Sequence, residues 1–162
     1  MDTFEEKLNC LLADLFNSIG KLEETTLRES RIDASISEVH LMDAIGMDNT
    51  ATVSCIAAKL GITPASVTVA VNKLESRGYV IKGKNPRDGR STHISLAKEG
   101  IRVYRLHRFF HRNMVHMLTK NLVNGEKELL YDGFDRLNNF LKDSAKKRAV
   151  KTSVRPRSAV RP

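Results

Sequence analysis

The sequence contains few cysteines and no long hydrophobic run, and each shortage excludes a class of protein. Cys10 and Cys55 are the two cysteines in 162 residues, which is too few for a disulfide framework, and neither has the clustered partners of a zinc site. No stretch reaches the roughly 18 apolar residues of a membrane span. Acidic residues follow Met1, where a signal peptide has basic and then apolar ones. We therefore expect a cytoplasmic protein with no membrane partner.

Motifs of catalysis are also missing from the sequence. It contains no phosphate-binding glycine loop, no nucleophile elbow and no paired-carboxylate arrangement. No residues can therefore be assigned to a reaction, and we expect neither an enzyme nor a cofactor. The chain has the length of one domain and is long enough to bury a core.

Charge is distributed unevenly along the chain. Residues 1–50 hold 4 Lys/Arg and 11 Asp/Glu, a net charge of −7, whereas residues 51–162 hold 23 and 8, a net charge of +15. Basic charge collected in one part of a sequence is typical of a protein that binds a polyanion. Nucleic acid is the leading candidate, and a solvated basic surface without a partner is the alternative.

Hydrophobic periodicity predicts four helices outside the central region. The first covers residues 3–28, and its apolar stripe contains Phe4, Leu8, Leu11, Leu15, Ile19 and Leu22. A second begins at Ser35, where Glu38 completes a capping box, and ends near Ile45 before Gly46. Two more are predicted at about 97–121 and 125–145.

Residues 53–72 follow the pattern of a helix-turn-helix. Ala57 is small enough to let two helices approach, and Gly61, four positions later, suits the positive φ of a tight turn. Thr63 can cap the second helix, whose first turn accepts Pro64 without losing a hydrogen bond. The predicted interhelix core consists of Ile56, Leu60, Ile62, Val67 and Ala70. An ordinary helical hairpin with this spacing is the alternative.

The second helix of this motif has an apolar face and a polar face. Its inward face is predicted to hold Val67, Ala70, Val71 and Leu74. The opposite face is small and polar, as entry into a DNA groove requires, since Asn pairs with adenine edges and Ser or Thr reaches bases or phosphates. The residues predicted to contact DNA are Thr63, Ala65, Ser66, Thr68, Val69, Asn72 and Lys73.

Residues 78–96 are predicted to form a β-hairpin. Residues 78–82 and 91–96 have the pattern of two antiparallel strands around a turn that contains Pro86 and Gly89. Beside a groove-reading helix, such a hairpin is a wing whose arginine enters the minor groove. We expect Arg87 to be that residue, and Asp88 and Arg90 to pair and position phosphates. The predicted contacts of this tip are Lys84, Arg87, Asp88 and Arg90. An exposed charged turn is the alternative.

Two passages, Leu74 to Val80 and Pro86 to Ser91, resemble the MarR family of winged-helix regulators. Asp88 and Arg90 stand at the positions of the family's Asp-x-Arg wing element. The resemblance implies a mostly α-helical winged helix-turn-helix with a small β-hairpin wing. It places one unit at residues 1–145, with DNA-binding residues 35–96 and dimerisation helices 3–28 and 97–145. It also implies a homodimer on double-stranded, pseudo-palindromic DNA.

The predicted dimer base combines apolar residues of the first and last helices. They are Phe4, Leu8, Leu11, Leu15, Leu130, Phe134, Leu137 and Leu141.

Residues 27–31, 36–40 and 105–115 resemble, more narrowly, the branch of this family that represses fatty-acid biosynthesis genes in Gram-positive bacteria. In that branch the co-repressor is a long-chain acyl group on acyl carrier protein, which is acidic. An arginine stripe on one helix suits such a partner, and it contains Arg102, Arg105, Arg108 and Arg112. Candidate residues for an acyl slot are Leu106, Phe109, Phe110 and Met114. Ordinary core packing with solvated arginines is the alternative.

Other functions rest on single features. Cys10 suggests an oxidant-responsive member of the same family, although nothing near it in sequence lowers the pKa of a thiol. A regulator responding to a small aromatic ligand and a winged-helix module that binds protein are further alternatives. His107 and His111 have a metal-ligand spacing, but no glutamate lies between them, so we predict no metal site.

The last segment, residues 146–162, contains seven Lys/Arg and no acidic residue. We expect a basic, disordered tail. Attraction to DNA phosphates and a purely solvating role are both open for it.

Overall fold

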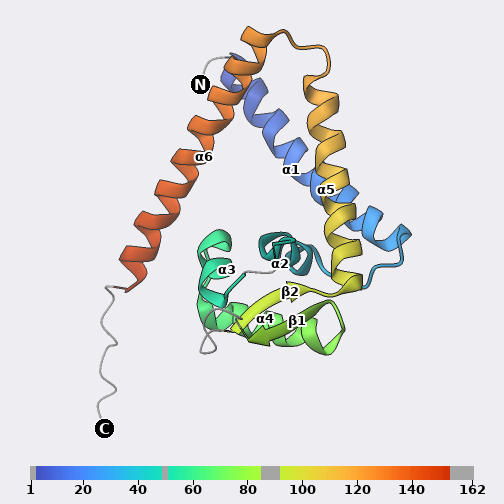
Figure 1. The fold of residues 1–162 in the computed structure, drawn as a ribbon. Coiled ribbons are helices and arrows are strands. Elements are labelled where there is room, and N and C mark those ends of the chain that lie inside the picture. The colour runs from blue at the N-terminus through green and yellow to red at the C-terminus, as the bar shows by residue number, and fades with distance from the viewer. Residues whose placement is uncertain (1–2, 49–50, 85–91, 154–162) are drawn as a thin grey trace. The chain divides into compact units, whose positions relative to one another are not determined.

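The computed structural model describes residues 3–48, 51–84 and 92–153, and the chain divides into two compact units, residues 1–114 and 115–162 (Figure 1). Three of the predicted wing-tip residues, Arg87, Asp88 and Arg90, lie outside the described residues, and so does the side chain of Lys84. Residues 154–162 of the predicted tail also lie outside them.

The first unit contains five helices and a two-stranded sheet among its described residues. They are α1 (Thr3–Glu29), α2 (Ile36–Ile45), α3 (Val53–Leu60), α4 (Pro64–Ser76), β1 (Val80–Lys84), β2 (Thr92–Leu96) and the greater part of α5 (Lys98–Thr119). The strands pair antiparallel, with Val80 opposite Leu96 and Lys84 opposite Thr92. Ala51 adds a bridge to Ile94. The predicted order of helices and strands is confirmed, and the fold is a winged helix-turn-helix.

Local capping explains where α2 begins. The backbone N–H of Glu38 donates to Ser35 Oγ at 3.3 Å, and the backbone N–H of Ser35 donates to Glu38 Oε2 at 2.8 Å. This reciprocal pair is the predicted capping box, and it satisfies two N–H groups that the helix itself leaves unpaired.

The turn between α3 and α4 is also as predicted. Gly61 has φ 65° and ψ 30°, the left-handed conformation that costs glycine least, and it follows the last residue of α3. Thr63 caps α4 by accepting the backbone N–H of Ser66 at 3.1 Å, and Pro64 occupies the first turn. The start of α4 is therefore fixed by its own sequence.

The core lies between α2, the helix-turn-helix and the sheet. Ile56, Val67, Leu74 and Ile94 are completely buried, and Ala57 is buried at the approach of α3 to α4. Leu60 and Ala70 are partly buried against this core.

The prediction that Ile62 belongs to this core is wrong. Its side chain is 43% exposed. The reason is its position: it follows the left-handed Gly61, and its backbone N–H bonds to the Ala57 carbonyl to close α3. That closing bond holds the residue in the turn rather than on the inward face of either helix.

The second unit consists of the last turns of α5 and the helix α6 (Asn124–Ser153). No side chain of residues 115–147 is buried, although several are large and apolar, including Leu129, Phe134 and Phe140. Helix α6 extends to Ser153, so the prediction of a disordered tail beginning at residue 146 is wrong for its first eight residues. Ala145, Ala149 and the basic residues between them all permit a helix to continue.

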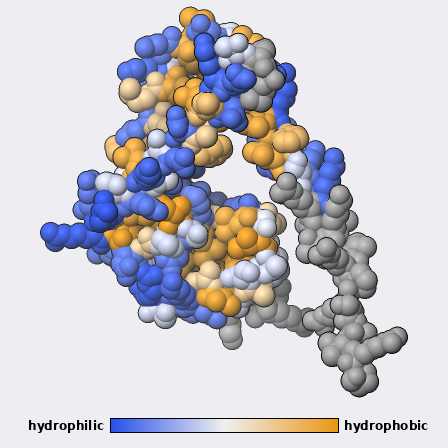
Figure 2. Space-filling view, turned by 180° about the vertical axis from the view of Figure 1, so that it is seen from behind, coloured by the Kyte–Doolittle hydropathy of each residue, from blue (hydrophilic) through white to orange (hydrophobic). Residues whose placement is uncertain are grey.

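Hydrophobic side chains reach the surface over the helical parts of the chain (Figure 2). In α1 they include four residues of the predicted stripe, Phe4, Leu8, Leu11 and Leu15, which are 42–69% exposed. A stripe of this kind requires a partner surface. Among the described residues no single helix is long and apolar enough to cross a membrane; α3 and α4 meet that criterion only when taken together across a 110° bend.

Candidate nucleic-acid interface and effector face

Helix α4 presents a polar face opposite its buried one. Ala65, Thr68, Val69 and Asn72 are exposed and follow the spacing of one helix face, and Val69 is 70% exposed. The buried side, Val67, Val71 and Leu74, is as predicted. A face of short side chains above a fully packed one has the form of an element that enters a DNA major groove.

Two predicted contacts on α4 already have partners within the protein. The Lys73 ammonium lies 2.9 Å from Glu38 Oε1, and Asn72 Oδ1 accepts a hydrogen bond from Lys82 Nζ. Lys82 also pairs with Glu75 at 2.6 Å, so this strand residue ties β1 to α4. Sequence reasoning missed Lys82; its place in the predicted strand that follows the groove helix was the available signal.

Glu38 is the residue that anchors α4 to α2. Its Oε1 lies 2.9 Å from Arg77 Nη1 as well as from Lys73, and its side chain is only 10% exposed. Burial alone raises the pKa of Glu38, but hydrogen bonds from the Ser35 backbone, Lys73 and Arg77 oppose it and lower the pKa from 4.5 to about 2. The glutamate is therefore ionised at neutral pH. It pairs with Lys73 of α4 and with Arg77, which follows the last residue of that helix.

Arg77 extends this network to the segment before α2. Its Nη2 lies 3.1 Å from Asp33 Oδ2 and donates to the Asp33 backbone carbonyl, which also accepts from Tyr79 at 3.2 Å. The guanidinium stacks over the Tyr79 ring, 5.3 Å from its centroid. The end of α4 is thus fixed by contacts that the sequence motifs did not predict.

The arginine stripe of α5 divides into two parts. Arg102 is occupied, because it pairs with Glu99 at 3.4 Å and donates to the Ser30 carbonyl at 2.7 Å. Arg105 and Arg108 are exposed and have no ion-pair partner among the described residues. Arg112 is exposed and stacks over Phe109, 5.9 Å from the ring centroid. Arg105 and Arg108 are consequently the members best placed to bind another molecule.

The predicted acyl-slot residues do not enclose a chain-sized cavity. Leu106 and Phe110 line a small, partly open space of about 10 Å³ together with Leu27 and Ile36, whereas Phe109 is 53% exposed. Met114 is half-buried and does not line this space. Such a volume holds at most one water molecule. Leu27 and Ile36 also border an open surface depression of about 710 Å³, whose rim includes Arg28 and Arg31.

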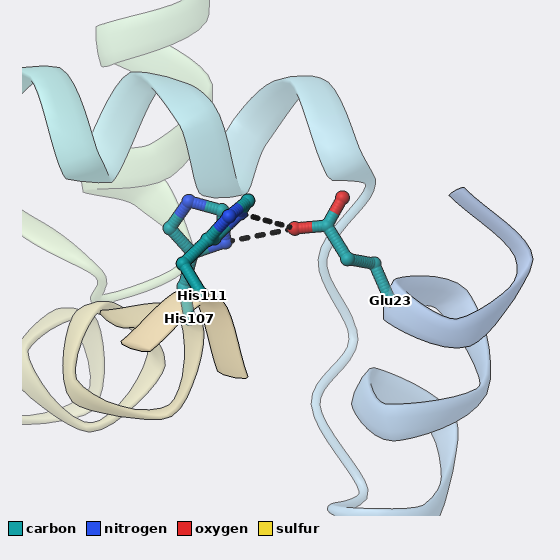
Figure 3. A group of neighbouring side chains, drawn as sticks. All are labelled: Glu23, His107 and His111. Atoms are coloured by element: carbon teal, nitrogen blue, oxygen red, sulfur yellow. Dashed lines mark hydrogen bonds and ion pairs between the residues drawn. The ribbon is translucent and has the colours of Figure 1, made fainter. Parts of the chain in front are cut away.

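A cluster of titratable side chains lies between α1 and α5 (Figure 3). Glu23 Oε1 lies 3.0 Å from His107 Nδ1 and 3.1 Å from His111 Nε2, and Glu23 and His107 are both buried. Burial lowers the pKa of His107, and the neighbouring His111 ring lowers it further, against the opposite effect of the Glu23 carboxylate. No glutamate lies between these histidines in the sequence, but the fold brings Glu23 to them from α1.

The two cysteines remain apart from any such cluster in the described structure. Both are exposed free thiols, Cys10 on α1 and Cys55 on α3. Nothing in these positions favours the oxidant-responsive alternative.

Known proteins similar to this chain share its winged-helix fold. The model of the MarR family matches residues 33–91. The crystal structure of Streptococcus pneumoniae FabT in complex with DNA is 34% identical, with a TM-score of 0.76 over 86% of this chain and 98% of that one. YfiV, an uncharacterised HTH-type transcriptional regulator of Bacillus subtilis strain 168, is 26% identical over 117 residues, 72% of each chain. Escherichia coli MarR is 21% identical, with a TM-score of 0.55 over 80% of this chain and 96% of that one, and shares the fold.

Proposed function

Because the chain belongs to the MarR family of dimeric DNA-binding transcription regulators, which are not enzymes, we propose that it represses fatty-acid biosynthesis genes. Its co-repressor in this proposal is a long-chain acyl group on acyl carrier protein. The single observation that carries the proposal is the 34% identity to FabT over nearly the whole of that protein. The exposed Arg105 and Arg108 of α5 support the acidic partner.

In this mode α4 of each subunit enters a major groove of a pseudo-palindromic site, with the two grooves about one helical turn apart, roughly 34 Å. Thr68, Val69 and Asn72 face the bases in this proposal, and Thr63 and Ser66 lie at the helix start, near phosphates. The Lys73–Glu38 pair holds α4 to α2, the Lys82–Glu75 pair holds it to β1, and together they fix the depth at which its face meets the groove.

The acyl carrier protein docks on α5 in the same proposal. Arg105 and Arg108 are exposed cations without an ion-pair partner in the described chain, and a long-range attraction of opposite charges brings an acidic protein to them. The acyl chain itself needs far more than a 10 Å³ space. Outward movement of Leu27 and Ile36 joins that space to the neighbouring depression and supplies the volume.

The test is operator affinity with and without the acylated carrier. Genomic fragments selected on the purified protein provide the operator, and fluorescence anisotropy measures its binding to the full chain. We expect long-chain acyl carrier protein to tighten binding, and we expect the unacylated carrier to have little effect. Equal affinity in the presence and absence of the acylated carrier contradicts the co-repressor, and selected fragments unrelated to lipid synthesis contradict the proposed genes.

Charge-reversal variants distinguish docking of the carrier at Arg105 and Arg108 from a general effect of the protein's net charge. Arg105→Glu and Arg108→Glu should abolish the response to the acylated carrier, because each puts a like charge against an acidic partner. Lys142→Glu, an equal change at an exposed position of α6, should retain the response. If the acylated carrier still tightens operator binding in both α5 variants, the carrier binds elsewhere on the protein.

A further inference from the structure

We propose that Glu23, His40, His107 and His111 form a binding site for a divalent transition-metal ion of the zinc class. The residues come from three helices, α1, α2 and α5, and meet within the first unit. This inference has its own ligand and does not rest on the acyl carrier, although Glu23 and His107 also line the 10 Å³ space beside Leu106 and Phe110.

The donor atoms have the separations of a metal site. The ligand atoms of Glu23, His107 and His111 lie within 4.8 Å of one another, and two of their contacts measure 3.0 and 3.1 Å. Tetrahedral zinc with ligands at about 2.0–2.1 Å places neighbouring donor atoms about 3.3 Å apart. Two of the donor separations are therefore within a few tenths of an ångström of those in such a site.

His40 supplies the fourth ligand. Its Nε2 lies 3.9 Å from Glu23 Oε2, and its ring centroid lies 5.4 Å from that of His107. Its side chain is 49% exposed, so a rotation of the ring toward Glu23 meets little resistance. One carboxylate and three imidazoles are a donor set that zinc and its neighbours accept.

The surroundings of Glu23 also suit a bound cation. Glu23 is 7% exposed, and among the described residues no lysine or arginine pairs with it. Its side-chain contacts are with the imidazole rings of His40, His107 and His111, whose nitrogens are metal ligands. A cation bound beside this carboxylate would offset the cost of burying it.

An unsatisfied oxygen lies next to this set. Asp43 Oδ1 is buried and has no hydrogen-bond partner among the described residues, and the Asp43 charge acts on His107. Asp43 also shares a surface pocket with His40, which lies three residues earlier on α2. When His40 or His107 binds metal through one ring nitrogen, the other N–H needs an acceptor, and Asp43 is available for that role.

The experiment is titration of the metal-stripped, full-length protein with Zn²⁺ against a coloured chelator. We expect one tight site per chain, and we expect the Co²⁺ form to show the intense visible absorption of four-coordinate cobalt. Glu23→Gln and His111→Ala should each weaken binding at least tenfold, because each removes a ligand. His116→Ala, an exposed histidine of the same helix, should bind as the parent does.

Circular dichroism before titration establishes that each variant is folded, and His111 is the safer of the two substitutions because its side chain is 36% exposed. The proposal is overturned if the parent protein does not bind one Zn²⁺ ion per chain. A folded His111→Ala variant with parental affinity also overturns it, since the cluster is then a hydrogen-bond network and the ion binds elsewhere.

Discussion

Glu38 Oε1 and Arg77 Nη1 lie 2.9 Å apart and join the start of α2 to the end of α4, the helix that presents the candidate DNA-binding face. The same carboxylate caps α2 through its other oxygen. One buried side chain therefore sets both where α2 begins and how α4 is held. Its removal leaves a half-buried guanidinium and a helix start without this acceptor.

Glu38 should make stability depend on acid pH. Its pKa is lowered from 4.5 to about 2 in the folded protein, so the stabilisation is fully present above pH 4.5 and is lost as the pH falls from 4.5 toward 2. We expect Glu38→Gln to lower the free energy of unfolding by about 1–3 kcal/mol at pH 7. Urea unfolding at pH 7 and at pH 3 measures this, and the difference between variant and parent should shrink at pH 3.

Glu75→Gln is the matched control for this prediction. Glu75 is also paired with a lysine, but its side chain is 40% exposed. An exposed pair contributes about 0–1 kcal/mol. A destabilisation at Glu75 as large as that at Glu38 would show that burial and the Arg77 ion pair are unimportant.

Gly100 should not tolerate a side chain. A Cβ at this position would clash with the Tyr79 carbonyl oxygen, where the start of α5 approaches the residue before β1. We expect Gly100→Ala to destabilise the protein by about 1–3 kcal/mol, despite the higher helix propensity of alanine. Thermal unfolding measures it. Lys98→Ala, two residues earlier and exposed, should change stability by less than about 0.5 kcal/mol.

Val69 should affect DNA binding without affecting folding. Its side chain is 70% exposed on the polar face of α4. Val69→Asp places a negative charge on this face, so we expect at least tenfold weaker operator binding by anisotropy and an unfolding free energy within about 0.5 kcal/mol of the parent. The buried neighbour gives the contrast, since Val67→Asp should unfold the protein. If Val69→Asp binds the operator with the affinity of the parent, this face of α4 is not part of the DNA interface.

Arg87 should bind a phosphate or enter the minor groove, a prediction that rests on the sequence of the wing tip. We expect Arg87→Ala to weaken DNA binding and to flatten the dependence of log K on log salt, with a slope smaller by about 0.9 for each phosphate that the protein no longer neutralises. Lys142→Ala, on α6, serves as the control for a change in net charge. A slope unchanged by Arg87→Ala contradicts the wing assignment.

Leu11 should be needed for dimerisation. It is 54% exposed in the single chain and lies on the predicted apolar stripe of α1. Leu11→Asp should dissociate the dimer, because a charge would be buried in an apolar interface. Light scattering after gel filtration measures the mass. Asn17→Asp introduces the same charge on the opposite side of α1 and should leave the dimer intact; monomers in both variants would argue against this stripe.

Local interactions made much of the fold predictable. The Ser35 capping box, the left-handed Gly61 and the Thr63 cap depend on residues within four positions of one another, so their spacing in the sequence is sufficient evidence. The same holds for the buried face of α4. Ile62 is the exception, because helical periodicity does not apply to a residue placed in the turn by the closing bond of α3.

What the sequence by itself determined is therefore the winged helix-turn-helix and the buried and exposed faces of α4. Only the tertiary structure decided which charged side chains pair with one another and which are exposed. Glu38 meets Arg77 across 39 residues, and Glu23 meets His111 across 88. Such pairings depend on how packed helices bring distant segments together. No local spacing encodes them, because a carboxylate has the same appearance in sequence whether it is solvated or buried among histidines.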